Sequence, residues 1–258
     1  MRTLERHRVL EGLEGYHHQT SEHYDLYYTD TDANVTTLIL ETAERVWAPV
    51  SAEMRSAPHG RVSLILYPSR DDLRKAFGWG QSESALGVYW QGTIRLLSPN
   101  VWLDGMKDQH DVEEFARLNP VAHELTHYIL DERTGGNYPR WFTEALAQQV
   151  EERVTGYVWL EPTSRISQDL YEYEELNLTF QTLSNQPLAY RQSYLFLRWL
   201  AERNGEQAVE QMIQGLAHGD SFPEAFASTY GRPPERLFSE WQEWALANAP
   251  LLDEPRAE

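Results

Sequence analysis

Two histidines and a glutamate stand close together in a hydrophobic segment of the chain. Residues 121–130 read VAHELTHYIL, so His123 and His127 are four positions apart and Glu124 follows the first histidine. In an α-helix, residues four apart lie on one face, which lets both imidazoles bind one metal ion. Glu124 would lie about 100° around the helix, where it can reach a water on that ion. The spacing therefore predicts two metal ligands and a general base. The alternative is a buried amphipathic helix that carries polar residues without a metal.

Two histidines leave a catalytic zinc site short of a ligand, because such sites have three protein ligands and one open position. Glu144 lies near the start of the next amphipathic segment. Gly135, Gly136 and Pro139 allow the chain to reverse between the two segments, and antiparallel packing would aim Glu144 at the histidines. The alternative is a solvated glutamate in a first helical turn, where it favours the helix dipole. Buried imidazoles need partners for their nitrogens, which favours the ligand interpretation.

Composition and charge restrict the class of protein. The chain has 258 residues, 41% hydrophobic and 12% aromatic, which is typical of a folded protein with a substantial core. No cysteine is present, so a zinc site must use His, Asp or Glu. The net charge of −18 argues against nucleic acid and anionic lipid as partners, and it would attract basic peptides. No apolar run reaches the length of a membrane span, and the first residues lack a signal-peptide pattern, so we expect a cytoplasmic protein unless a signal sequence has been removed.

Strand patterns precede helix patterns along the chain, which favours an α+β fold. The sequence predicts strands over residues 23–29 and 61–67, and either a hairpin or a bent strand over residues 86–98, broken at Gln91-Gly92. It predicts helices over residues 35–55, 69–77, 112–131, 141–152, 193–204, 207–216, 222–229 and 233–247. Residues 155–187 are less regular and contain several acidic residues.

The stretch from His123 to His127, followed by Pro139–Ala147 (PRWFTEALA), resembles the gluzincin metallopeptidases and, among them, the small bacterial peptidase-MA-like domains. Their pattern is HExxH, a short loop, then P-x-W, an apolar residue and x-E-G-x-A; this chain has Ala145 in place of the usual glycine. The resemblance covers residues 20–245, although only the metal motif is highly specific. It implies a zincin-like fold: an N-terminal extension (1–20), an α/β subdomain with a small mixed sheet ending in the HExxH helix (21–134), a helical subdomain (135–249) and a flexible tail (250–258).

The resemblance also implies the roles of the site residues. His123, His127 and Glu144 would bind one zinc ion per chain, and Glu124 would be the general base. Tyr190, with Tyr194 in reserve, would stabilise the oxyanion; the alternative for Tyr190 is an aromatic residue of the core at a helix start. The edge strand of the sheet would bind an extended peptide substrate through the backbone of Gly92, Thr93 and Ile94. Gln148 is either a partner of a ligand or an ordinary surface glutamine.

Two functions are consistent with these residues. The first is a zinc metallopeptidase that hydrolyses peptide bonds through a zinc-activated water. It would act on a peptide or protein substrate, and the negative net charge favours basic peptides. The second is a non-catalytic zinc- or peptide-binding module of gluzincin fold. A module without turnover has no need of a base at Glu124, so the sequence favours the peptidase. The oligomeric state is not indicated.

Overall fold

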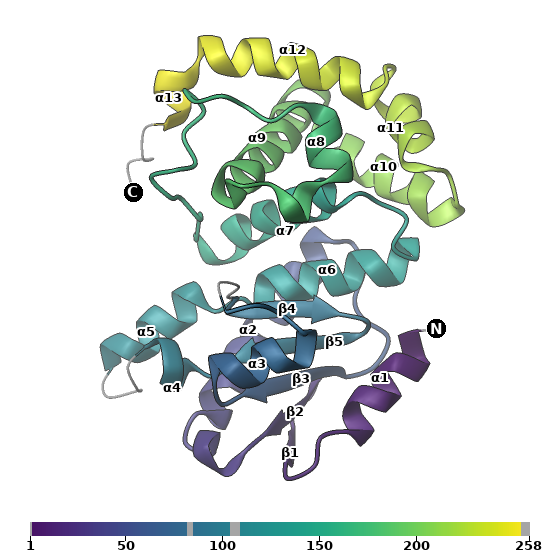
Figure 1. Cartoon of the computed structure of the whole chain (residues 1–258). Coiled ribbons are helices and arrows are strands. Elements are labelled where there is room, and N and C mark those ends of the chain that lie inside the picture. The colour runs from purple at the N-terminus through teal and green to yellow at the C-terminus, as the bar shows by residue number, and fades with distance from the viewer. Residues whose placement is uncertain (1, 82–84, 104–108, 254–258) are drawn as a thin grey trace. The chain divides into compact units, whose positions relative to one another are not determined.

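The computed structural model of the chain describes residues 2–81, 85–103 and 109–253 (Figure 1). It divides into two compact units. The first comprises Met1–Ile129 and Val150–Tyr157, and the second comprises Leu130–Gln149 and Val158–Glu258. Helices α6 (Val121–Thr134) and α7 (Arg140–Thr155) each contribute residues to both units. No helix in the described part of the chain is long and apolar enough to cross a membrane.

The first unit contains a five-stranded mixed sheet. Its order is β1 (His17–Thr20), β2 (Tyr24–Tyr28), β3 (Val62–Tyr67), β5 (Thr93–Leu97) and β4 (Gly87–Trp90). Strands β2, β3 and β5 are parallel, while β1 and β4 pair antiparallel at the two edges. Every residue of β3 and β5 is buried, as expected for strands covered on both faces. The expected mixed α+β architecture with a small N-terminal sheet is confirmed.

Helices cover both faces of this sheet. On one face, α3 (Arg70–Phe77) packs over a core of Ile65, Tyr67, Leu73 and Leu97, against which α1 (Arg2–Glu11) also packs (Figure 1). On the other face lies α2 (Thr36–Glu53). The ring centroid of its Trp47 lies 5.4 Å from that of Tyr24. The short elements η1 (Asp30–Asp32) and α4 (Pro99–Trp102) follow β2 and β5. Helix α1 and strand β1 lie in the segment expected to be an extension; β1 is a short, exposed HHQT stretch without alternation, so its sequence gave no strand signal.

The single helix expected over residues 112–131 is wrong. The structure has two helices there, α5 (Gln109–Leu118) and α6, separated at Asn119-Pro120. A residue before proline is disfavoured in the helical conformation, so Asn119 leaves the helix. Its side-chain oxygen then accepts a hydrogen bond from the N–H of Val121 at 3.2 Å and caps the start of α6. The HExxH segment therefore begins a new helix whose first turn is fixed by Asn119 and Pro120.

The second unit is helical. It contains α8 (Tyr173–Leu178), η2 (Phe180–Thr182), α9 (Gln186–Asn204), α10 (Glu206–His218), α11 (Phe222–Tyr230), α12 (Pro234–Ala247) and α13 (Ala249–Asp253). Aromatic rings form much of its core. The ring centroid of Phe196 lies 5.4 Å from that of Trp141, 5.0 Å from that of Phe238 and 5.7 Å from that of Trp241. Part of the expected flexible tail is helical, because the Asp253 carboxylate accepts hydrogen bonds from the backbone of Ile166 and Ser167. Residues 254–258 lie outside the described residues.

Candidate active site

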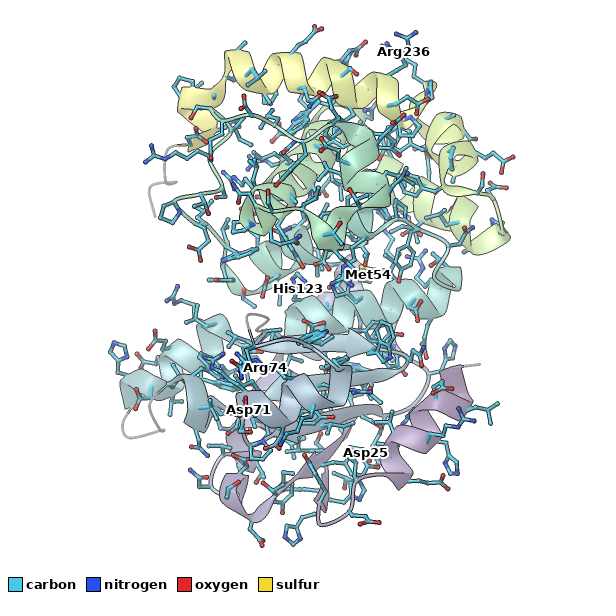
Figure 2. All side chains as sticks on the ribbon, viewed as in Figure 1. Asp25, Met54, Asp71, Arg74, His123 and Arg236 are labelled. Atoms are coloured by element: carbon cyan, nitrogen blue, oxygen red, sulfur yellow. The ribbon has the colours of Figure 1, made fainter. Side chains whose placement is uncertain are left out.

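His123 and His127 project from successive turns of α6, as their spacing predicts. Their ring centroids are 4.8 Å apart and the rings are nearly perpendicular. His127 is buried and His123 is half-buried; Figure 2 labels His123 on this helix. Two imidazoles so close in a region of low exposure need polar partners, since burying an unpaired ring nitrogen costs free energy.

Glu144 lies on α7, and its side chain is only 1% exposed. The Nη2 atom of Arg140, one turn earlier, lies 2.5 Å from its carboxylate Oε1. A solvated glutamate, the alternative considered for this position, is therefore wrong. A buried carboxylate requires positive charge nearby. One ligand atom each of His123, His127 and Glu144 lies within 4.8 Å of the others, so these side chains could hold a metal ion.

A further carboxylate, Glu151, contacts the first histidine. Its Oε2 lies 3.2 Å from Nδ1 of His123, and the two side chains are 9% and 15% exposed. In the tautomer with the proton on Nδ1, the carboxylate accepts that proton and Nε2 is the nitrogen left for a metal. The sequence prediction did not include Glu151. It follows Glu144 by seven residues, two helical turns, and this spacing on the same face of α7 could have pointed to it.

Glu124 is buried beside the edge strand β4. Its Oε2 accepts a hydrogen bond from the backbone N–H of Tyr89 at 2.5 Å. The two elements approach closely at Gly87, where an added Cβ would come within 2.6 Å of Pro120 Cγ and 3.1 Å of Glu124 Cγ. Only glycine permits this approach. The sheet edge and the first turn of α6 thus position the expected general base together.

The structure contradicts the edge strand expected from the sequence. Thr93 and Ile94 belong to β5, which pairs with β3 on one side and β4 on the other, and both residues are fully buried. Gly92 lies in the turn between β4 and β5, at φ 84°. None of these residues offers a free strand edge to a peptide. In the described part of the chain, β4 is the edge next to β5, because β5 rather than β4 pairs with the parallel strand β3.

The family of the protein follows from a comparison of the whole chain. A sequence model of the peptidase MA superfamily matches residues 32–247. The chain belongs to this superfamily. A search of curated proteins finds no match. The matched range includes the helix with both histidines, the helix with Glu144 and all strands except β1 and β2. Membership supports a peptidase, and superfamily members are typically metal-dependent.

The two tyrosines considered for oxyanion stabilisation lie on α9 of this peptidase. The ring of Tyr190 packs edge-on against Trp159 and Phe180, each at 5.2 Å. Its carbonyl accepts a hydrogen bond from Gln148 Nε2 at 3.2 Å, and the carbonyl of Tyr194 accepts one from Gln149. Gln148 is therefore buried and ties α7 to α9, rather than being an ordinary surface glutamine. The catalytic role of Tyr190 stays a prediction.

Proposed function

We propose that the protein is a zinc-dependent peptidase that hydrolyses peptide bonds, with Glu124 as its general base. The observation that carries the proposal is the group of His123, His127 and Glu144, whose ligand atoms lie within 4.8 Å of one another. Two imidazoles and one carboxylate are the donors that catalytic zinc takes in proteins. Membership of the peptidase MA superfamily supports the same activity.

The residues present fit a zinc ion chemically. Glu144 is a buried anion, and Glu151 occupies Nδ1 of His123 so that one ring nitrogen remains for coordination. His127, Glu144 and Nε2 of His123 would hold the ion. When bound, zinc polarises the scissile carbonyl and lowers the pKa of a coordinated water.

Glu124 supplies the proton transfers. Its carboxylate takes a proton from the attacking water, and the oxygen of that water forms a bond to the carbonyl carbon. Glu124 then returns the proton to the nitrogen of the leaving amine as the C–N bond breaks, so the base is regenerated. The N–H of Tyr89 holds one carboxylate oxygen at 2.5 Å, which fixes the orientation of the base in the free protein.

Tyr190 is our candidate for stabilising the negative charge that develops on the carbonyl oxygen. A hydroxyl donor aimed at that oxygen lowers the barrier more in the transition state than in the ground state. Tyr190 is half-buried, whereas Tyr194 is 2% exposed and its ring packs under Arg191. Tyr190 is therefore better able than Tyr194 to touch a substrate.

The test separates metal binding from turnover. Purified protein should contain about one zinc per chain by elemental mass spectrometry, and it should cleave members of a panel of basic and apolar peptides. Glu124→Gln should keep the zinc and lose hydrolysis by about 100-fold or more, because the base is gone while the ligands remain. Glu132→Gln, at an exposed position of the same helix, is the matched control and should behave as wild type.

Two results would contradict the proposal. Full activity of Glu124→Gln on a peptide that the native protein cleaves would remove Glu124 from the mechanism. Stoichiometric zinc without cleavage of any peptide would instead identify a non-catalytic zinc-binding module. Removal of the metal by a chelator should abolish hydrolysis, and added zinc should restore it.

A further inference from the structure

Arg140 places its guanidinium against the buried carboxylate of Glu144. We propose that Arg140 is a positioning residue of the metal site, which orients the Glu144 carboxylate and supplies positive charge that the site needs together with zinc. The inference rests on the proposed zinc peptidase and adds a residue that is neither a ligand nor part of the HExxH motif. Both residues lie in the second unit, within Leu130–Gln149.

The contact joins a buried anion to a partly exposed cation. Nη2 of Arg140 lies 2.5 Å from Oε1 of Glu144, and the two side chains are 43% and 1% exposed. An ion pair between two solvated side chains contributes little, because water screens both charges. A carboxylate removed from water has lost its hydration, so the loss of a cationic partner leaves an uncompensated buried charge. The pair therefore matters more to Glu144 than a surface ion pair would.

Helix stability alone does not explain an arginine at this position. Arg140 is the first residue of α7, and the N-terminus of a helix carries a partial positive charge that disfavours a cation. The order of the pair is also the less favourable one, because an acidic residue followed four positions later by a basic one stabilises a helix more than the reverse. The contact with Glu144 is the better explanation of Arg140.

The backbone of Arg140 is anchored on both sides. The carbonyl of Pro139 accepts a hydrogen bond from the N–H of Phe142 at 3.2 Å. Trp141 is 1% exposed, and its ring centroid lies 5.4 Å from that of Phe196. A substitution of Arg140 should therefore remove the guanidinium without moving the start of α7.

The charges of the site favour an arginine that stays when zinc binds. Glu124, Glu144 and Glu151 are 6%, 1% and 7% exposed, and when ionised they carry three negative charges. A zinc ion supplies two positive charges, and histidines bind it in their neutral form. Arg140, which is always protonated, supplies the third positive charge. Zinc and Arg140 together neutralise the three carboxylates, whereas zinc alone would leave one negative charge buried.

The experiment measures the affinity of the folded protein for zinc by competition with a chromophoric chelator. Arg140→Ala should weaken zinc binding about 10- to 100-fold, the usual effect of removing the partner of a ligand. Arg140→Lys keeps the charge but not the planar guanidinium, so its affinity should lie between the two. Arg153→Ala is the matched control and should bind zinc as wild type does. Arg153 is on the same helix, its side chain is 37% exposed, and it pairs with Glu53 at 2.6 Å.

Rescue by guanidinium ions distinguishes this role from a general loss of stability. Because the Arg140 side chain is partly exposed, a small cation can reach the space that Arg140→Ala opens. Guanidinium chloride, well below the concentrations that unfold proteins, should tighten zinc binding by Arg140→Ala, and sodium chloride at the same ionic strength should not. Circular dichroism checks that the variant is folded. If Arg140→Ala does not fold, Arg140→Lys provides the affinity comparison, since it keeps a cation beside Glu144.

The outcomes separate Arg140 from the peptidase activity. Equal zinc affinity in wild type and the Arg140 variant, or no difference between the two salts, would overturn the positioning role. Tighter zinc binding by the variant would also overturn it, because the guanidinium would then compete with zinc for Glu144. None of these results would affect the cleavage of peptides by wild type. If wild type binds zinc but cleaves no peptide, the peptidase proposal fails while the affinities still test Arg140. Wild type that binds no zinc would overturn both.

Discussion

A carboxylate that the HExxH motif does not include lies against His123. Glu151 Oε2 lies 3.2 Å from Nδ1, and a carboxylate at this distance favours the tautomer that carries the proton on Nδ1 and presents Nε2. We predict that Glu151→Leu weakens zinc binding by about 10- to 100-fold, the usual effect of removing such a partner. Glu151→Gln, which keeps an acceptor oxygen, should lose less. Competition with a chromophoric chelator measures the affinity.

NMR spectroscopy of the metal-free protein checks the same contact without relying on zinc. In ¹⁵N spectra of the metal-free protein, the proton on Nδ1 of His123 should be visible in wild type and lost from that nitrogen in Glu151→Leu. Glu152→Gln, the next residue of α7, serves as the control. Equal zinc affinity in wild type, Glu151→Leu and Glu152→Gln would show that Glu151 does not position the histidine.

At this scale the sequence predicted the positions of residues well where helical spacing determines them. Residues four apart in a helix must share a face, so the proximity of His123 and His127 follows from local structure alone. Glu144 required the assumption that a second helix packs beside the first. The seven-residue spacing places Glu151 on the same face of α7 as Glu144. The contact of Glu151 with His123 and the contact of Tyr89 with Glu124 depend on tertiary packing, which no local pattern in the sequence encodes.

At the scale of elements, the sequence predicted where strands and helices lie along the chain better than it predicted which strands pair with one another. The apolar run of β3 indicates a buried strand, and Gln91-Gly92 indicates a hairpin or a bent strand; the buried strand and the hairpin are confirmed. A hairpin alone, however, is symmetrical: either strand can be the one that joins the rest of the sheet. Burial of all five residues of β5 reflects its pairing with β3, and this pairing made the expected peptide-binding strand wrong.

One contact between elements should respond to pH. The Glu44 carboxylate of α2 accepts hydrogen bonds from the backbone N–H of His23 at 2.8 Å and from its Nδ1 at 2.6 Å. Burial raises the pKa of Glu44, but the nearby Ser21 hydroxyl and the two hydrogen bonds from His23 lower it by more, so the net pKa falls below the ordinary 4.5. A folded-state pKa below the unfolded value stabilises the fold above pH 4.5, and this stabilisation disappears as the pH falls through the folded-state value.

We therefore predict that Glu44→Gln lowers the free energy of unfolding by about 1 kcal/mol at neutral pH. The difference from wild type should shrink as the pH is lowered below the folded-state pKa, because the wild-type carboxylate is then protonated. Urea unfolding across this pH range measures both values. Glu41→Gln, on an exposed turn of α2, should show neither effect. A difference that grows on acidification would contradict the linkage.

At the scale of the whole molecule, the two compact units do not follow the order of the elements along the chain. Strands come first and helices later, as the sequence predicts, yet Val150–Tyr157, a segment that begins within α7 and ends beyond it, joins the unit that contains the sheet. Glu151, which lies in this returning segment, meets His123 of the same unit. A contact between residues 28 positions apart arises because the chain returns, and periodicity within one segment cannot reveal such a return.

The net charge of −18 makes a prediction about substrates that belongs to the whole chain rather than to any subsite. A strongly negative surface raises the local concentration of cations, and salt screens this field within about 10 Å at 0.1 M. At low salt, kcat/KM should be higher for a peptide flanked by lysines than for the same peptide flanked by glutamates. Added sodium chloride should bring the ratio towards one, because the field is screened while the cleaved sequence stays the same. A neutral peptide of that sequence is the control, and its kcat/KM should change little. A lysine preference that persists at high salt would contradict this explanation. It would show that the preference comes from a specific acidic contact close to the cleaved bond, since only a short-range ion pair escapes screening.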